Sequence, residues 1–455
     1  MKWESKSFSD LVDIIGGGTP KTSIDEYWNG NIPWISIKDF NSDQKYVLNT
    51  EKTITEMGLN NSSTKLLNKN DIIISARGTV GEVAMIKYEM AFNQSCYGLK
   101  VHDLLDKDFV YYLLKYNINK LKNMVHGAVF DTITTNTFDN IIVNVPPREY
   151  QEKISYLLSN IDNLIEVKIH ENNHLQNQID ILFKSFFINF DFYNGNYKET
   201  IFGNIPSEWN LCLFNDVLNE RNEKSTNQEI PMFSVTLEGI QPRANIYNKK
   251  ITAKTTKFKI IHKHDLIFGM PSSGYQYGVM YDEIGGVSSA YPVFEIKGIQ
   301  PRYVDLFIKH TSNYFNDIVK SGSRMGQGID KKVLLSKEIY IPPKEYLDKY
   351  YAIESNLVCM VNHNLNEINN LSKLRDTLLP KLMSGEIDVS KINYDLKKII
   401  RKFILIILNY LWRRLYENKN YFKNTKSNET ILKSRPIYKI DKLFIKFIRR
   451  CRYPR

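Results

Sequence analysis

The sequence has few cysteines and no long apolar run, and each shortage excludes a class of protein. Its 455 residues include four cysteines, at positions 96, 212, 359 and 451, with no CxxC or Cys/His ligand spacing. We therefore predict neither a zinc site nor a disulfide framework, and expect a reducing, cytoplasmic compartment. The longest apolar run, 403–412, has ten residues and is interrupted by Asn409, whereas a bilayer span needs ~20. We expect no membrane segment, and residues 1–10 lack the apolar core of a signal peptide.

The net positive charge is confined to one end of the chain. Residues 391–455 carry 19 Lys and Arg against 4 Asp and Glu, so the other 390 residues carry −4 of the net +11. Charge alone is therefore weak ground for predicting DNA binding. Three interpretations of this basic tail stay open. It is a basic arm that adds sequence-independent DNA affinity, read-through or frame-shifted sequence, or an amphipathic membrane-surface helix around 397–415.

An internal duplication organises the chain. The sequence VPPREY at 145–150 recurs as IPPKEY at 341–346, and this offset of 196 holds without a gap for over thirty residues. Earlier positions also correspond, at slightly different offsets: Trp3, Phe8 and Asp10 with Trp209, Phe214 and Asp216, and Asp71 and Ser95 with Asp265 and Ser289. The order is therefore unit, helix, unit, helix and tail.

Both segments after the Pro-Pro pairs have heptad-like apolar spacing. The first stripe is Ile154, Leu158, Ile161, Ile165, Leu175, Ile179, Leu182 and Phe186, and the second is Leu357, Val361, Ile368, Leu371, Leu378 and Leu382. Polar residues interrupt both: Lys168 and Asn172 in the first, Asn364 and Arg375 in the second, with Asn364 equivalent to Lys168. Polar seam residues fix register and partner choice. A 33-residue helix is a rod of roughly 50 Å. The alternative is two ordinary amphipathic helices packed on a globular core.

Each Pro-Pro pair predicts the end of a strand and the start of a helix, because proline lacks a donor and biases its predecessor to extended backbone. The strands expected are 141–145, 338–341, 71–75 and 265–268. The fold class is α+β, with two globular domains separated by two long helices. The predicted boundaries are 1–148 and 193–343 for the domains, 149–192 and 344–390 for the helical spacers, and 391–455 for the tail.

Several blocks carry a family pattern. IGGGTP at 15–20, YW at 27–28, IPWI at 32–35, SARGTVG at 75–81 and NQ at 93–94 resemble the recognition domain of type I restriction specificity subunits. LSKLRDTLLPKLMSGEI at 371–387 is similar to the usual C-terminal stretch of that family. The resemblance covers residues 1 to about 390. The chain departs from the family pattern in running on beyond it.

The resemblance implies a non-catalytic subunit that binds double-stranded DNA. Two target-recognition domains would each hold one half of an asymmetric bipartite site, and the helices would pair as an antiparallel coiled coil that sets the gap. It also implies two modification subunits and two restriction subunits as partners. Adenine methylation or cleavage would belong to them, with S-adenosylmethionine, ATP and Mg, and this chain itself would hold no cofactor.

The motifs of catalytic classes are incomplete. Residues 16–22 end in Lys-Thr but lack P-loop spacing and contain Pro20. The sequence VPPR at 145–148 is superficially similar to an adenine-methyltransferase loop, but its first and last residues differ, and the repeat explains it better. The eight histidines have no metal-ligand spacing.

Base reading needs side chains that reach base edges, and loops rich in Gly, Ser and Thr let the backbone approach DNA. The candidates are Thr19, Lys21, Lys38, Arg77, Thr79, Asn93, Gln94 and His126 in the first unit, and Arg243, Ser272, Ser273, Tyr275, Gln276, Arg324 and Gln327 in the second. For each one the alternative is a turn cap or an ordinary surface residue. Arg77 and Arg324 are favoured, because each lies in a Gly/Ser loop beside a strand.

Three rival functions stay open. A nuclease in the tail would need clustered carboxylates, whereas Asp395, Glu417, Glu429 and Asp441 are dispersed. A scaffold would bind DNA weakly and without regard to sequence. A specificity subunit of another restriction class would share the repeat.

Overall fold

The computed structural model of the chain describes residues 3–41, 44–125, 132–225, 229–237, 239–243, 257–269, 275–320 and 328–390. Residues up to Ile387 form one compact unit, and Asp388–Arg455 form a second. Only 388–390 of the second unit are described, so the structure says nothing of the basic tail. Below, domain 1 is the part from β1 to β11 and domain 2 the part from β12 to β26. The domain boundaries expected from the sequence stay predictions.

Domain 1 is built from three antiparallel or mixed sheets. Its first strand, β1 (Glu4–Ser7), pairs with its last, β11 (Ile142–Val145). The other strands are β2 (Val12–Gly16), β3 (Trp28–Ile35), β4 (Tyr46–Val47), β5 (Lys52–Ile54), β6 (Lys65–Leu67), β7 (Ile72–Ser75), β8 (Val83–Ile86), β9 (Met90–Phe92) and β10 (Cys96–Val101). They form sheets of order β2-β10-β7-β8-β4 and β5-β3-β9-β6. The helices are η1 (Phe8–Leu11), η2 (Asp25–Tyr27), η3 (Ile37–Asp39), α1 (Glu56–Asn60), α2 (Lys107–Val125) and α3 (Thr135–Asp139).

Among the described residues, domain 2 has more sheets than domain 1, and most of them have only two strands. Its strands are β12 (Tyr197–Thr200), β13 (Gly203–Pro206), β14 (Asn210–Leu213), β15 (Leu218–Glu220), β16 (Lys224–Ser225), β17 (Phe233–Thr236), β18 (Gly239–Pro242), β19 (Phe258–His262), β20 (Asp265–Phe268), β21 (Tyr277–Val279), β22 (Ile284–Ser288), β23 (Val293–Ile296), β24 (Val319–Lys320), β25 (Gly328–Ile329) and β26 (Glu338–Ile341). The sheets run β15-β23-β20-β21 and β16-β19-β22, with the pairs β12-β13, β14-β26, β17-β18 and β24-β25. Its helices are α5 (Phe214–Val217), α7 (Pro301–His310), η4 (Ser312–Ile318) and α8 (Lys331–Leu335).

The duplication is visible in the strand order. The run β2-β10-β7-β8 of domain 1 has the same connectivity as β15-β23-β20-β21 of domain 2, and β1-β11 corresponds to β14-β26. Two predicted strands begin one residue later than expected, at Ile142 and Ile72, and the predicted strands 338–341 and 265–268 have the observed bounds.

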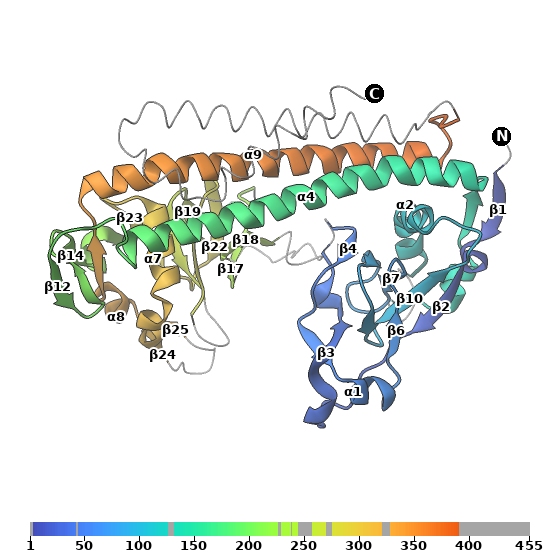
Figure 1. Cartoon of the computed structure of the whole chain (residues 1–455), viewed down its shortest axis with the longest axis horizontal. Helices are drawn as coiled ribbons and strands as arrows, with labels where there is room; N and C mark the ends of the chain where they lie inside the picture. Colours follow the sequence, from blue (N-terminus) through green and yellow to red (C-terminus); the bar gives the residue numbers. More distant parts are fainter. Residues whose placement is uncertain are drawn as a thin grey trace, which may run out of the picture. The chain divides into compact units, whose positions relative to one another are not determined.

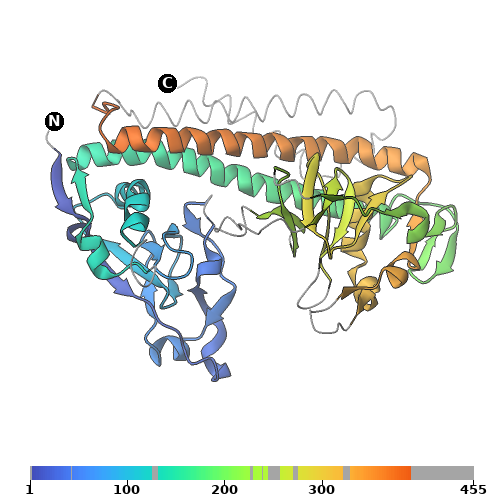
Figure 2. The same ribbon diagram turned by 180° about the vertical axis from the view of Figure 1, so that it is seen from behind.

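Two long helices join the domains and pack against each other, α4 (Arg148–Phe187) and α9 (Lys344–Met383) (Figure 1). Pro147 and Pro343 are their N-caps, as the repeat predicts. Each has 40 residues, which makes a rod of about 60 Å. Lys168 contacts Asn364 while the earlier Asp162 contacts the later Arg375, so the helices are antiparallel. The same pairing is seen from behind in Figure 2. The predicted α+β class with an antiparallel coiled coil is confirmed.

The seam between the helices is more polar than the heptad pattern suggests. Most of the α4 stripe is buried, although Phe183 replaces the half-buried Leu182 at its end. On α9 most apolar positions of the stripe are half-buried, whereas Asn364 and Arg375 are buried. Lys168 Nζ donates to Asn364 Oδ1 at 3.1 Å, and Asn364 Nδ2 donates to Asn172 Oδ1 at 3.0 Å. The two repeat-equivalent residues, Lys168 and Asn364, therefore meet at the centre of the pair.

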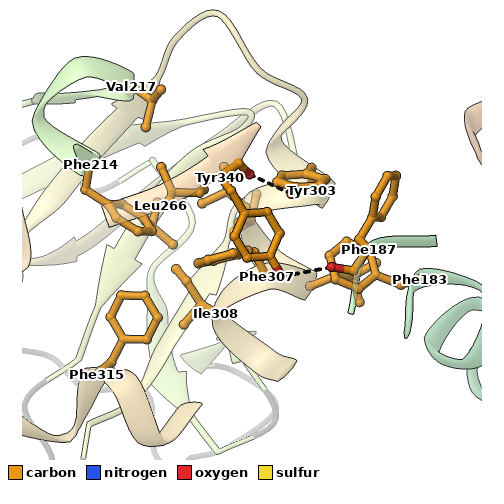
Figure 3. Packing of buried hydrophobic residues seen from close by; sticks show 14 of the residues in the cluster. Phe183, Phe187, Phe214, Val217, Leu266, Tyr303, Phe307, Ile308, Phe315 and Tyr340 are labelled. Atoms are coloured by element: carbon orange, nitrogen blue, oxygen red, sulfur yellow. Dashed lines mark hydrogen bonds between the residues drawn. The ribbon is translucent and has the colours of Figure 1, made fainter. Parts of the chain in front are cut away.

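The core of domain 2 extends onto the helix pair through aromatic rings. Phe183 and Phe187 of α4 pack against Tyr303 of α7, with ring centroids 5.5 and 5.2 Å apart (Figure 3). Tyr303 donates to the carbonyl of Tyr340 at 2.7 Å, and Tyr340 donates to the carbonyl of Phe187 at 2.8 Å. Helix α4 is thus part of the domain 2 core and not only a spacer.

Candidate functional site

Three loops of domain 1 meet at the ends of its central strands. They are 17–21 after β2, 76–82 after β7 and 93–95 after β9. The Gly18 amide donates to the carbonyl of Phe92 at 3.0 Å. A Cβ at Gly17 would lie 2.1 Å from the carbonyl oxygen of Asn93, so only glycine permits this approach. The glycine run noted in the sequence therefore closes one loop onto another.

The structure brings four predicted DNA-binding residues into this loop cluster. Thr19 Oγ1 donates to Gln94 Oε1. Asn93 Oδ1 accepts from the Ser95 amide at 3.0 Å, and the Ser95 carbonyl accepts from the Arg77 amide at 3.2 Å. These bonds hold Thr19, Arg77, Asn93 and Gln94 on adjoining loops, with the Arg77 and Gln94 side chains exposed.

The loop that carries Arg77 is tightly wound. Gly78 and Gly81 have φ of 76° and 87°, in the left-handed region that glycine adopts without strain. Ser75 Oγ donates to the carbonyl of Thr79 at 2.5 Å and accepts from the Glu82 amide at 2.8 Å. Thr79 is half-buried. The turn thus presents Arg77 from a backbone fixed on both sides.

Two further candidates of domain 1, Lys21 and Lys38, lie near this cluster. Lys21 is exposed, and its carbonyl accepts from Trp28 Nε1 at 3.2 Å. Lys38 is exposed and forms an ion pair with Glu51 at 3.2 Å. Its neighbour Ile37 lies against the Gly78 turn. His126 lies outside the described residues.

In domain 2 the described candidates serve internal contacts. Arg243 Nε donates to the carbonyl of Phe233 at 3.2 Å and to Ser234 Oγ at 3.1 Å. Tyr275 donates to the carbonyl of Ser312 at 3.0 Å, and burial raises its pKa to about 12. The carbonyl of Gln276 accepts from the Gly269 amide at 2.8 Å. The other four candidates lie outside the described residues: Ser272, Ser273, Arg324 and Gln327. Base contact stays a prediction in both domains.

A second group of residues, missed by the sequence analysis, docks domain 1 on α4. We call it the polar stripe: Gln151, Ser155, Ser159, Asp162 and Glu166. Spacings of three and four place these side chains on one helix face. Four contacts join the stripe to domain 1. Gln151 accepts from the Asp106 amide at 3.0 Å, and Ser155 donates to Asp106 Oδ1 at 2.5 Å. Lys45 donates to Ser159 at 2.8 Å, and Lys87 donates to Glu166 at 2.8 Å.

The fifth member of the stripe, Asp162, also connects domain 1 to α9. Its Oδ2 accepts from the Tyr112 hydroxyl, and its Oδ1 accepts from Arg375 Nη1 at 2.8 Å. Tyr112, Asp162 and Arg375 are all buried. Burial, together with Asp162, raises the pKa of Tyr112, so the phenol stays a neutral donor. Burial opposes the charged form of Arg375, but Asp162 and Asp376 together outweigh it, so the pKa of Arg375 is raised. A period-3.6 search for polar residues on α4 could have found this face.

Domain 2 docks on the helices differently. Beyond the aromatic contacts of Phe183 and Phe187, it uses two ion pairs, one partly exposed and one with a buried carboxylate. Lys309 Nζ lies 2.7 Å from Asp180 Oδ2 of α4, and Arg302 pairs with Glu354 of α9.

The part of the chain that the structure describes contains neither a metal-binding cluster nor a membrane-spanning helix. No group of three or more His, Cys, Asp or Glu side chains there could hold a metal ion. No helix there is long and apolar enough to cross a membrane.

Comparison with known proteins finds matches to one kind of protein. Residues 1–177 match the type I restriction modification DNA specificity domain. The type I restriction enzyme MjaIX specificity subunit of Methanocaldococcus jannaschii is 27% identical over 417 residues, which cover 86% of this chain and 94% of that protein. The chain is thus similar to type I restriction specificity subunits over most of its length.

Other specificity subunits match over smaller parts or at lower identity. The HindI specificity subunit of Haemophilus influenzae is 31% identical over 174 residues, which cover 36% of this chain and 38% of that one. A type I restriction-modification S subunit from M. genitalium, solved by crystallography, is 16% identical. It covers 84% of this chain and 96% of its own, with a TM-score of 0.41.

Proposed function

We propose that this specificity subunit reads an asymmetric bipartite DNA site, with one half-site bound by each domain and the gap set by α4 and α9. The observation that carries the proposal is the duplicated strand order around an antiparallel helix pair in which the equivalent residues Lys168 and Asn364 touch. Two related domains with unlike loop residues read unlike sequences, so the target is asymmetric.

The loop cluster of domain 1 is the base-reading surface in this proposal. Arg77 offers a guanidinium that can pair bidentately with guanine, and Gln94 an amide that can pair with adenine. Loop 93–95 bonds to the Arg77 turn through the Ser95 carbonyl and is itself held by Gly17 and Thr19 of loop 17–21, so the Arg77 side chain is presented from a rigid backbone. Rigid presentation supports discrimination, because a mobile arginine would bind phosphate and base alike.

The chemistry belongs to other subunits in this proposal. Two modification subunits would methylate adenine with S-adenosylmethionine, and two restriction subunits would cleave DNA with ATP and Mg, in the cytoplasm. This chain would hold no cofactor and catalyse no step. It would contribute affinity for one site, typically ~10³–10⁷ over non-specific DNA.

Methylation-sensitive genome sequencing tests the proposal. A host that carries this gene with its partner genes is compared with the same host lacking only this gene. We expect a split adenine-methylated motif that depends on the gene. The chain cut after Val389 is run in parallel, because it removes the basic tail. Absence of a gene-dependent motif with both the full and the shortened chain would contradict the proposal.

Arg77→Ala tests the assignment of the reading loop. We expect binding of the target to weaken by about 1–3 kcal/mol and one base of a single half-site to become degenerate. The same substitution should leave the other half-site unchanged, as read from the methylated motif. Glu152→Ala, which removes an exposed partner of Arg148 on α4, is the matched control and should leave both half-sites intact.

A further inference from the structure

The buried Asp162–Arg375 ion pair has no counterpart at the repeat-equivalent positions of the helix pair. By the 196-residue offset, Asp162 of α4 is equivalent to Val358 of α9, and Arg375 of α9 is equivalent to Ile179 of α4. Ile179 and Val358 belong to the apolar cluster of domain 2. At the domain 1 end these equivalent positions hold an ion pair, whereas at the domain 2 end they hold two aliphatic residues.

Stability alone does not account for a buried ion pair at such a place. Replacing a buried ion pair by apolar residues of similar size is often neutral or stabilising, because two desolvated charges offset much of their own attraction. Ile179 and Val358 show that the helix pair accommodates apolar side chains at the equivalent positions. The ion pair must then contribute something that aliphatic side chains do not.

The network adds hydrogen bonds, whose strength depends on the direction in which donor and acceptor meet. Asp162 accepts from Tyr112 of α2 on one oxygen and from Arg375 of α9 on the other, so one carboxylate joins three helices. Arg375 is itself held, since its Nε donates to Asp376 Oδ1 at 3.0 Å. Hydrogen bonds weaken steeply when bent, whereas aliphatic contacts tolerate sliding. A shift of α2 on the helices would break at least one bond to a buried charge.

Lys45 adds a second point of attachment one helical turn away. Its ammonium donates to Ser159 of α4 at 2.8 Å and lies 2.6 Å from Asp108 of α2, with the side chain almost fully buried. Two directional contacts on one face of α4 fix both the position and the rotation of α2 along it.

We propose that the Tyr112–Asp162–Arg375 network is a positioning device that holds domain 1 in one orientation on the helix pair and so restricts the target to one gap length. The proposal rests on the function proposed above. Tyr112, Asp162 and Arg375 are positioning residues and not DNA contacts, because all three are buried. Domain 2 docks through rings, aliphatic groups and the pairs Lys309–Asp180 and Arg302–Glu354. Among the described residues it has no ion pair at the positions equivalent to Asp162 and Arg375.

The test replaces the whole network by apolar side chains in the full chain. The variant Tyr112→Phe/Asp162→Leu/Arg375→Met removes both charges and the phenol that would otherwise lose its acceptor. Methylation-sensitive sequencing is repeated in the host with its partner genes. We expect unchanged half-sites, with methylation at gaps one base pair shorter or longer raised on the order of tenfold, the ratio that corresponds to one lost hydrogen bond's discrimination.

Two further variants keep the test falsifiable. Ile179→Val/Val358→Ile exchanges one methyl group between the equivalent apolar positions and should keep the single gap of the parent chain. Tyr112→Phe alone keeps the ion pair and should broaden the gap less than the triple variant. If circular dichroism shows that the triple variant is unfolded, the range of gap lengths methylated with Tyr112→Phe alone tests the proposal.

The outcomes separate the two proposals. Absence of any motif with the parent chain contradicts the proposed function itself. A parent motif with one gap, kept unchanged by a folded triple variant, overturns the positioning role and leaves the function standing. Loss of the half-sites in a folded triple variant also overturns it, because the network would then serve base reading. Broadening in the apolar control as well would show that any seam change has this effect, which overturns the special role of the network.

Discussion

The two domains dock on one helix pair by different chemistry. Domain 1 places Lys45, Lys87 and Tyr112 on the polar stripe of α4, whereas domain 2 packs Tyr303 on Phe183 and Phe187. At the positions of α9 equivalent to Gln151, Ser155 and Asp162, the repeat has Leu347, Tyr351 and Val358. Duplication has thus kept strand order and helix geometry while the docking surfaces diverged.

The difference teaches that backbone architecture sets few demands on the chemistry of a domain contact. Aromatic docking gains from area and depends weakly on angle, with rings worth about 0.5–1.5 kcal/mol per pair beyond burial. Polar docking gains little net free energy but penalises displacement. The domains should therefore respond differently to truncation, to pH and to salt.

The largest effect is expected from Phe187→Ala, which opens a cavity in the aromatic docking surface. Phe187 is fully buried against Trp209, Tyr303 and Tyr350, so the free energy of unfolding of domain 2 should fall by about 3–5 kcal/mol. Hydrogen exchange resolved by mass spectrometry in urea measures each domain separately. Phe192→Ala, at an exposed ring, is the control. Equal losses from both variants would refute the docking role.

Asp162→Ala should have a comparable or slightly smaller effect on domain 1. It leaves Arg375 buried without its carboxylate partner and Tyr112 without its acceptor, at a cost of about 3–5 kcal/mol. Exchange protection of α2 should fall while domain 2 is unchanged. The contrast is sharpened by Asp162→Leu/Arg375→Met, which should recover most of the loss. A double variant as unstable as Asp162→Ala would show that the ion pair itself carries the stability.

A smaller, pH-dependent effect is expected at His310 of domain 2. Burial lowers the pKa of His310, against the opposing charge of Asp180. The folded state therefore binds a proton less readily than the unfolded state, and stability is lost as the pH falls below the ordinary histidine value of about 6.5. Urea unfolding at pH 7.5 and 5.5 measures the loss. His310→Gln should reduce that difference, and an unchanged difference would assign it to other groups.

The smallest effect is expected from Lys309→Ala. Its ion pair with Asp180 is partly exposed, and such pairs contribute about 0.2–1 kcal/mol. The loss should shrink as salt is raised, because exposed charges are screened. Urea unfolding of domain 2 in low and high salt measures both values. A loss that salt leaves unchanged would mean that the lysine acts through packing and not through its charge.

Much of the architecture followed from local signals. The Pro-Pro pairs predicted where β11 and β26 end and where α4 and α9 begin, because proline cannot continue a strand ladder and starts helices well. The apolar spacing predicted the long helices α4 and α9, and the family resemblance implied their antiparallel pairing. The structure closes the loop of the glycine run at 16–18 on Asn93. The site residues were harder to predict from the sequence, since the predicted DNA contacts Arg243 and Tyr275 have partners inside the protein.

The sequence by itself determined the two-fold repeat, the order of units and helices, and the loops that carry Thr19, Arg77 and Gln94. These depend on interactions between residues close in the chain, which leave a periodic or motif-like trace. Only the tertiary structure decided that Asp162 meets Arg375 and Tyr112, and that Lys168 meets its own equivalent, Asn364. Those partners are brought together by the packing of whole helices, and a buried charge becomes stable only when that packing supplies its counter-charge.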